Sequence, residues 1–201
     1  MIKGFQQKAK VGGSINSTFL ALIPKEVNPT SFDHFRPISL CNASYKIPSK
    51  LLENIIKPLL EKLISSSQSG FVIGRHVLDN VALVQETIHS SLHHHEKGMI
   101  IKLDMTNAFN RVRHSFLLQV LTTFSFSYVF IRIIKACIGE PWIAPLVNGK
   151  PSSYFKAMRG IRHGCPLSPF LYILMVDSLS RKLTTEKIKG TFPGIRVVRG
   201  T

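Results

Sequence analysis

The sequence predicts a globular protein of mixed class, either α/β or α+β. Segments with the composition of strands interleave along the 201 residues with segments that repeat apolar residues at the helical period. Apolar residues make up 44% of the chain, which is enough for a packed core. The most apolar stretch, residues 116–138, also contains Gln119, Arg132 and Lys135, so it indicates buried globular helices and no membrane span.

The N-terminal part predicts a β-hairpin followed by a helix. Residues 17–27 are mainly β-branched and apolar before a polar run. Residues 35–40 resume extended structure, because the residue before a proline avoids the α region, and the two stretches can pair as a hairpin. Residues 49–64 repeat leucine and isoleucine at the helical period, and Pro58 is expected to kink or split that helix.

The middle of the chain predicts a loop, a second helix and a strand. Residues 65–75 are rich in glycine and serine, which is typical of a loop. Asp79 is a candidate N-cap for a helix that runs to about His94 with a buried apolar stripe. Gly98 ends that helix, and the apolar residues 99–105 then predict a strand.

The C-terminal half predicts three more helices and a tight hairpin. Residues 115–138 indicate two short helices. Asn148-Gly149 lies between apolar residues and is a strong hairpin signal. Ser168-Pro169 combines an N-cap with a proline at the first helical position, so a helix is expected over residues 170–183. A short extended run is expected at residues 195–198.

The charge of the chain predicts a polyanionic partner. Lys and Arg number 26 against 11 Asp and Glu, so the formal net charge is +15. Nucleic acid is the first candidate and an acidic membrane surface the second, while an ordinary basic protein remains an alternative. The three cysteines, Cys41, Cys137 and Cys165, form no CxxC pair, which indicates neither a disulfide framework nor a thiolate zinc site. No signal peptide is recognisable at the N-terminus.

One aspartate stands out as a candidate metal ligand. Asp104 lies at the end of the predicted strand 99–105 and leads into the next element. A carboxylate projecting there can hold Mg²⁺, which prefers oxygen ligands and substrate phosphates, and the backbone carbonyl of Met105 can add a ligand. The alternative is that Asp104 only caps the following helix.

Six segments stand out in order along the chain: LIPK (22–25), FRPISLCNASYKI (35–47), QSGFVIGR (68–75), IKLDMTNAF (101–109), LVNG (146–149) and RGIRHGCPLSPFLYIL (159–174). Together they resemble the reverse transcriptase domain of non-LTR (LINE-type) retrotransposons, especially the plant lineage. The resemblance implies an α+β right-hand polymerase with a fingers-like region at 1–97. It also implies a partial palm at 98–201, in which an incomplete antiparallel sheet packs on helices. The implied activity is RNA-templated DNA synthesis with an RNA template, a DNA primer, deoxynucleoside triphosphates and two Mg²⁺ ions.

The same resemblance assigns roles to individual residues. The residues matching the metal ligands and the incoming-nucleotide contacts are Asp104, Met105 through its carbonyl, Lys25, Arg36, Phe109, His163 and Gly164. Those matching template contacts are Gln68 and Arg75. An aromatic ring such as Phe109 would pack under the incoming sugar and exclude a 2′-hydroxyl, whereas its alternative is plain core packing. Solvated surface charges are the alternative for Lys25 and Arg36, and an ordinary turn is the alternative for Gly164.

The chain departs from the family pattern at the catalytic acids. The family carries a Tyr/Phe-Ala-Asp-Asp turn after the last palm helix, and no Asp-Asp pair occurs in these 201 residues. We therefore expect a truncated and catalytically incomplete fragment that does not polymerise DNA alone. The alternatives are a non-catalytic basic RNA- or DNA-binding module and a decayed pseudogene product without function. By analogy the location is nuclear or cytoplasmic.

Overall fold

The computed structural model describes residues 15–94 and 98–191, which belong to two compact units. Within those ranges, the first unit takes the residues up to Ile56 together with Asn107–Tyr172. The second unit takes Lys57–Thr106 together with the residues from Ile173 onward. Each unit therefore combines segments that are far apart in the sequence, and each is described by itself. The mixed α+β class predicted from the sequence is confirmed.

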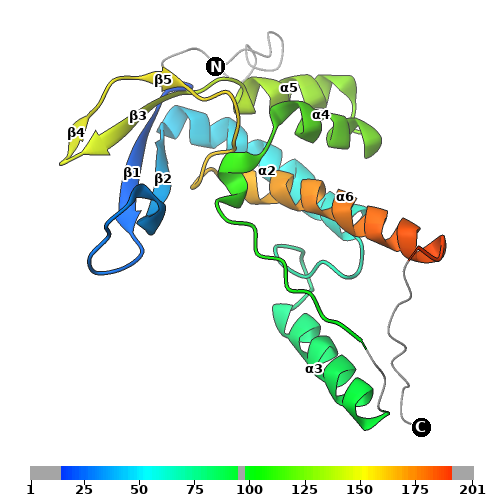
Figure 1. The fold of residues 1–201 in the computed structure, drawn as a ribbon. Coiled ribbons are helices and arrows are strands. Elements are labelled where there is room, and N and C mark those ends of the chain that lie inside the picture. The colour runs from blue at the N-terminus through cyan, green and yellow to red at the C-terminus, as the bar shows by residue number, and fades with distance from the viewer. Residues whose placement is uncertain (1–14, 95–97, 192–201) are drawn as a thin grey trace. The chain divides into compact units, whose positions relative to one another are not determined.

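A mixed sheet forms one side of the first unit (Figure 1). Strand β1 (Thr18–Pro24) pairs antiparallel with β2 (Phe35–Cys41), from Thr18 opposite Cys41 to Pro24 opposite Phe35. A 3-10 turn, η1 (Phe32–His34), lies in the connection. This pairing confirms the predicted hairpin. On its other edge β1 pairs in parallel with β3 (Trp142–Val147), so the sheet is not purely antiparallel.

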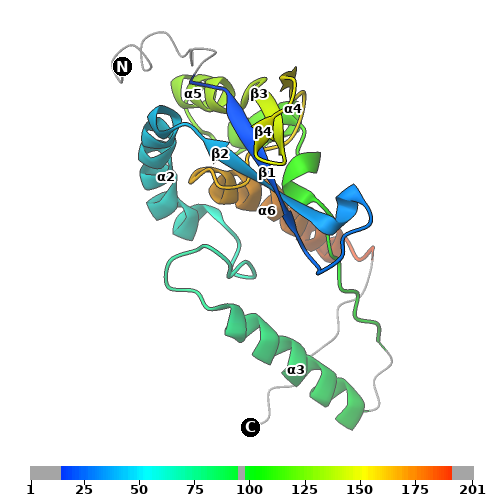
Figure 2. The same cartoon turned by 90° about the vertical axis from the view of Figure 1, so that its left-hand side faces the viewer.

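Two short strands complete the sheet. Strand β4 (Lys150–Pro151) forms the predicted hairpin with β3. The two residues of the turn, Asn148 and Gly149, have φ angles of 51° and 74°, and a two-residue hairpin turn of type I′ requires positive φ at both positions. Strand β5 (Phe155–Lys156) also pairs antiparallel with β3. Figure 2 shows the β3–β4 ribbon beside the β1–β2 hairpin.

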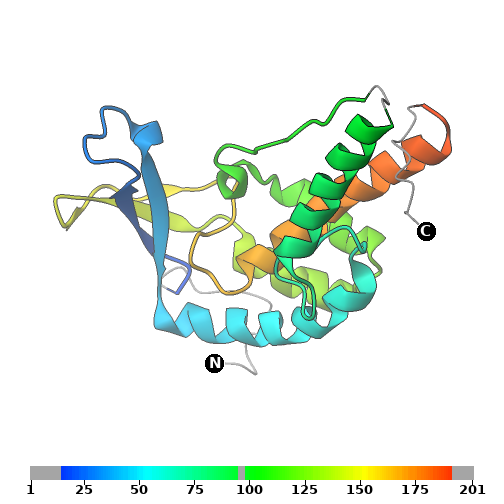
Figure 3. The same cartoon turned by 90° about the horizontal axis from the view of Figure 1, so that it is seen from below.

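Helix α2 (Ala43–Leu63) follows β2 almost directly, as Figure 3 shows. The side-chain oxygen of Asn42 accepts from the backbone N–H of Ser44 at 2.9 Å and so caps the helix start. The helix therefore begins six residues before the predicted start at Ser49, since the cap precedes the apolar repeat. It also runs unbroken through Pro58, so the predicted split is wrong.

Two more helices and the first residues of a third, up to Tyr172, belong to the first unit and contribute to its core. Helices α4 (His114–Thr123) and α5 (Tyr128–Ile138) confirm the two helices predicted within 115–138. The Ser127 hydroxyl accepts from the Phe130 N–H at 3.3 Å and caps α5. Helix α6 (Ser168–Ile188) begins at the predicted Ser-Pro and extends five residues beyond the predicted end. The apolar core residues with no more than 1% exposure in this unit are Ile56, Leu117, Leu121, Ile134, Cys137, Ala144, Leu167 and Leu171.

In the second unit, helix α3 (Val77–His93) is present but its predicted buried stripe is wrong. Asp79 is not the cap, because the helix begins one residue after His76. None of the helix's described residues is buried, and Val81 and Ile88 are exposed. The spacing of the apolar residues indicates that the segment is an amphipathic helix. Burial of those residues also requires another element that packs against the helix. None of the described helices is long and apolar enough to cross a membrane.

The strand predicted at residues 99–105 is absent from the described structure. These residues follow no regular secondary structure, and Ile100, Ile101 and Leu103 are exposed. A strand needs a neighbouring strand for its backbone hydrogen bonds, and no described strand pairs with this segment. The extended run predicted at 195–198 lies outside the described residues.

Candidate functional site

The basic loop at residues 159–165 is fixed to a short 3-10 turn, η2 (Ala108–Arg111). The N–H of Ile161 donates to the carbonyl of Phe109 at 2.9 Å, and the His114 ring donates to the carbonyl of Gly160 at 2.7 Å. Gly160 has a φ of +92°, and a Cβ there would lie 3.2 Å from the Asn110 backbone. Glycine at this position therefore allows both the left-handed backbone and the close approach of the loop to η2.

This anchoring brings two of the predicted nucleotide contacts together. The ring centroids of Phe109 and His163 lie 4.7 Å apart, and that of Tyr172 lies 5.1 Å from Phe109. Burial lowers the pKa of His163, because desolvation disfavours the imidazolium. The ring is thus neutral near pH 7 and stacks as an uncharged aromatic group.

Gly164 lies directly against strand β2. The N–H of Ser39 donates to the carbonyl of His163 at 2.9 Å. Gly164 has a φ of +89°, and a Cβ on it would lie 3.2 Å from the carbonyl oxygen of Ser39 and 3.9 Å from Ile38. Because side chains alternate along a strand, Arg36 projects from the same face of β2 as Ile38. The first unit thus contains one continuous region that is made up of Phe109, His163, Gly164 and the strand that carries Arg36.

Replacing Gly164 by Ala is expected to destabilise the chain more than replacing Gly149 by Ala. Both glycines have positive φ, so each substitution introduces backbone strain of about 1–2 kcal/mol. At Gly149 no atom lies within 4 Å of the added Cβ, whereas at Gly164 the Ser39 carbonyl lies 3.2 Å away and must shift. Urea unfolding of the two variants measures the difference, and equal midpoints would show that the close approach to β2 is unimportant.

The two predicted triphosphate cations lie along the β1–β2 hairpin. Arg36 is exposed and stands opposite Ile23 of β1. Lys25 is exposed at the end of β1, where its ammonium donates to the carbonyl of Asp33 at 2.7 Å across the connection. Both charges therefore face solvent on one element, and Lys25 also closes the hairpin tip.

Arg162 is a structural residue that the sequence analysis missed. Only 7% of it is exposed, and its guanidinium lies 4.1 Å from the centre of the Tyr45 ring. It donates to the backbone and side-chain oxygens of Asn16 and, at 3.4 Å, to the carbonyl of Cys137. The loop is thereby tied to α2, α5 and the entry to β1. No local sequence signal distinguishes this arginine from the exposed Arg159 beside it.

In the second unit, Arg75 holds together the loop that contains Gln68. Its guanidinium donates to the carbonyls of Ser65 at 2.5 Å and Gln68 at 2.7 Å. It also donates at 3.2 Å to the carbonyls of Glu61 and Ile64 at the end of α2. The sequence predicted a template contact for Arg75, and its intramolecular role was not foreseen. The side-chain amide of Gln68 donates to the Gly70 carbonyl at 3.3 Å.

Asp177 is the buried carboxylate of the second unit. One of its oxygens accepts from the Ser65 hydroxyl at 2.6 Å and from the Ser65 N–H at 2.9 Å. The other oxygen accepts from Arg181 at 2.7 Å. Burial favours a raised pKa, but these hydrogen bonds outweigh it, so the pKa of Asp177 lies below its ordinary value. Both oxygens of this carboxylate are therefore occupied by hydrogen bonds to Ser65 and Arg181.

Asp104 and Met105 lie in the irregular segment of the second unit. Both are exposed, and Asp104 offers a single carboxylate. Among the residues that the structure describes, no group of three His, Cys, Asp or Glu side chains is placed to hold a metal ion. Mg²⁺ is commonly held by one or two carboxylates with substrate phosphates. Asp104 fits one such ligand, but the described residues do not make up a site for two Mg²⁺ ions.

Known proteins resemble most of this chain. Residues 23–198 match the family described as reverse transcriptase (RNA-dependent DNA polymerase). The 149 kDa protein of transposon TX1 from Xenopus laevis is 31% identical over 196 residues, which cover 96% of this chain and 15% of that protein. The Pol polyprotein of the type-2 retrotransposable element R2DM from Drosophila melanogaster is 29% identical over 178 residues, which cover 86% of this chain and 16% of that protein. The chain therefore belongs to the reverse transcriptase (RNA-dependent DNA polymerase) family, as a domain of the non-LTR retrotransposon kind.

Proposed function

We propose that the chain is the nucleotide- and template-binding part of a retrotransposon RNA-directed DNA polymerase. The observation that carries this proposal is the contact between the Phe109 and His163 rings next to Gly164, which lies against the strand that bears Arg36. An incoming nucleotide would place its sugar on Phe109 and its base near His163 and Gly164. Its triphosphate would meet Arg36, whose guanidinium suits bidentate phosphate contacts.

Further contacts are proposed within each unit by itself. Lys25 adds a second cation for the triphosphate at the hairpin tip. Gln68 and Arg75 belong to the template side, where Arg75 acts by holding the shape of its loop rather than by a free guanidinium. Asp104 and the Met105 carbonyl would ligate Mg²⁺, which in this family neutralises the phosphates during transfer. The RNA template, DNA primer and deoxynucleoside triphosphates are the proposed ligands.

The proposed organisation follows the polymerase pattern. We assign residues 1–97 to a fingers-like region and residues 98–201 to a partial palm. The exposed apolar segment 99–105 supports this assignment, because its side chains suit a strand of a larger antiparallel sheet. The compact units interleave these two stretches.

The 201-residue chain is expected not to extend a primer. Two-metal phosphoryl transfer needs more than one carboxylate, Asp177 is committed to Ser65 and Arg181, and no Asp-Asp pair is present. A poly(rA)/oligo(dT) extension assay with Mg²⁺ measures this directly, and we expect no incorporation above background. Incorporation that is abolished by Asp104→Ala would contradict the proposal and show that one carboxylate of this chain suffices.

A second candidate, a non-catalytic nucleic-acid-binding module, is favoured by the net charge of +15. In either case we expect affinity for an RNA–DNA hybrid to fall steeply with salt, since bound phosphates displace counterions. Arg36→Gln should weaken binding of a deoxynucleoside triphosphate about tenfold by removing one charge-assisted contact to its phosphates. Lys135→Gln, which removes one exposed charge from α5, is the matched control and should change the affinity little. Equal losses in the two variants would show that only overall charge matters.

A further inference from the structure

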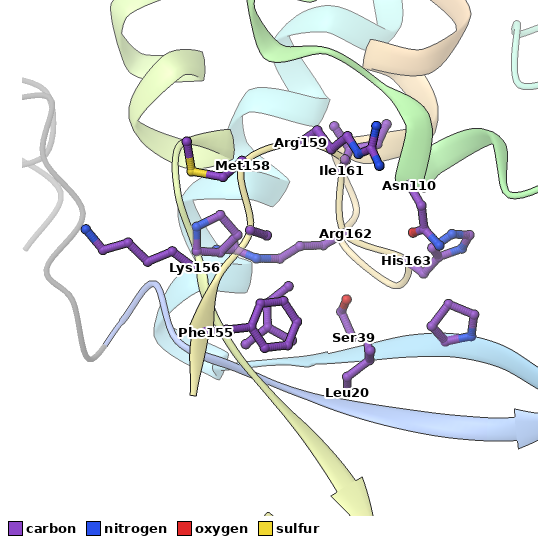
Figure 4. A pocket seen from close by; sticks show the side chains of 15 residues that line it. Leu20, Ser39, Asn110, Phe155, Lys156, Met158, Arg159, Ile161, Arg162 and His163 are labelled. Atoms are coloured by element: carbon purple, nitrogen blue, oxygen red, sulfur yellow. The ribbon is translucent and has the colours of Figure 1, made fainter. Parts of the chain in front are cut away.

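A pocket of about 380 Å³ lies in the first unit between the sheet and the segment 157–163 (Figure 4). This volume falls within the range of small-molecule sites. Figure 4 shows Phe155 and Leu20 on the strand side of the pocket and Arg159 and Ile161 on the loop side. All the lining residues belong to the first unit, so the pocket is a property of that unit alone.

The pocket lies on the opposite face of the sheet from Arg36. Pro37 and Ser39 line it, and side-chain alternation directs them away from the face that carries Arg36 and Ile38. Ile143 and Phe155, which are paired across β3 and β5, belong to the pocket's apolar floor. The pocket shares His163 with the proposed nucleotide surface but opens on the other face of the sheet, and it does not rest on the proposed function.

The polar part of the lining is strongly basic. Lys156, Arg159 and Arg162 contribute its positive charges, and no Asp or Glu is among the described lining residues. The Lys156 ammonium lies 3.5 Å from Glu140, outside the pocket lining, whereas Arg159 has no carboxylate partner among the described residues. An apolar floor beneath uncompensated guanidinium groups favours an anion that carries a flat ring.

Arg162 strengthens this electrostatic argument. It is buried, and its hydrogen-bond partners are amide and carbonyl oxygens, with no carboxylate among those described. Its Nε–H has no hydrogen-bond partner in the described part of the chain. A buried charge without a counter-ion leaves a positive potential in the adjoining space, which an anionic ligand would neutralise.

We propose that this pocket binds a small aromatic anion. The ring lies on Phe155 and Ile143, and the phosphate or carboxylate group meets Arg159 with the buried Arg162 behind it. Such a ligand uses both the apolar floor and the basic wall, so neither an uncharged ring nor a free anion alone binds as well.

The test titrates the full chain with 1-naphthyl phosphate, 1-naphthol and inorganic phosphate by calorimetry. We expect 1-naphthyl phosphate to bind at least about tenfold more tightly than either of the other two. Arg159→Gln should weaken binding of 1-naphthyl phosphate about tenfold, and Phe155→Ala should weaken it without affecting inorganic phosphate. Lys150→Gln removes an exposed charge from the neighbouring hairpin and is the matched control.

Two results would overturn the proposal. One is undiminished binding of 1-naphthyl phosphate by Arg159→Gln. The other is a loss on Arg36→Gln as large as on Arg159→Gln, which would place the probe on the nucleotide surface. Thermal melting of each variant confirms that it is folded. Failure of the nucleotide proposal would appear instead as an unchanged affinity for a deoxynucleoside triphosphate in Arg36→Gln.

Discussion

Replacing Asp177 by Asn is expected to destabilise the chain by about 3 kcal/mol. The carboxylate is buried and accepts hydrogen bonds from Ser65 and Arg181. An amide of the same size supplies one acceptor oxygen and turns an NH₂ group, which cannot accept a hydrogen bond, toward one of these donors. Urea unfolding of the wild type and the variant measures the loss as a shift of the midpoint.

The matched control is Glu186→Gln on the same helix. Glu186 also pairs with two cations, Lys182 at 2.8 Å and Lys189 at 3.3 Å, but these pairs are at the surface. Water replaces such partners readily, so we expect no measurable change in the unfolding midpoint. Similar midpoints for the two variants would mean that Asp177 is not committed to its internal partners and remains available for another role.

The same carboxylate predicts how stability depends on pH. Its pKa is depressed in the folded state, because the hydrogen bonds outweigh the effect of burial. A depressed pKa contributes stability that is present above the ordinary value of 3.8 and is lost as the pH falls through the folded-state value. The stability difference between wild type and Asp177→Asn should therefore narrow as the pH is lowered below 3.8.

Elements whose signals lie within a few consecutive residues could be predicted from the sequence. Asn148-Gly149 forms its tight turn, and Ser168-Pro169 begins α6. Ser127 caps α5 through its own hydroxyl. In each case the cap or turn is satisfied by neighbouring backbone groups, so no distant contact is needed to fix it.

Elements that depend on a partner could not be predicted in the same way. The apolar residues of α3 remain exposed although their helical period was recognised. Residues 99–105 have the composition of a strand, but no described strand provides the hydrogen bonds that one requires. Composition reports what a segment can bury or pair, whereas its environment decides whether it does.

The candidate site likewise contains residues that could be predicted from the sequence and residues that could not. The sequence predicted nucleotide contacts at Phe109, His163 and Gly164, and the structure places these residues close together. It did not identify Arg162, because a buried arginine held by carbonyl oxygens has no local signature. Arg75 likewise has the appearance of a surface cation in the sequence, and its four carbonyl contacts appear only in the folded loop.

Replacing Arg162 by Ala is expected to cost about 3 kcal/mol of stability. The change leaves the oxygens of Asn16 and Cys137 without their donor and opens a space beside Tyr45. Arg162→Lys should recover little of the loss, because one ammonium cannot replace the planar fork. Arg159→Ala is the control, since this neighbouring cation is exposed and its loss should change stability by less than about 0.5 kcal/mol.

Cysteine reactivity provides an independent measure of the role of Arg162. Cys41, Cys137 and Cys165 are free and buried, and burial raises the pKa of Cys137 to about 12. A thiol with such a pKa is almost entirely protonated at neutral pH and reacts slowly with disulfide reagents. If Arg162 holds the loop against α5, Arg162→Ala should speed labelling of these thiols by a thiol-specific disulfide reagent, whereas Arg159→Ala should not. Unchanged labelling and an unchanged urea midpoint in Arg162→Ala would show that the loop keeps its place without this arginine.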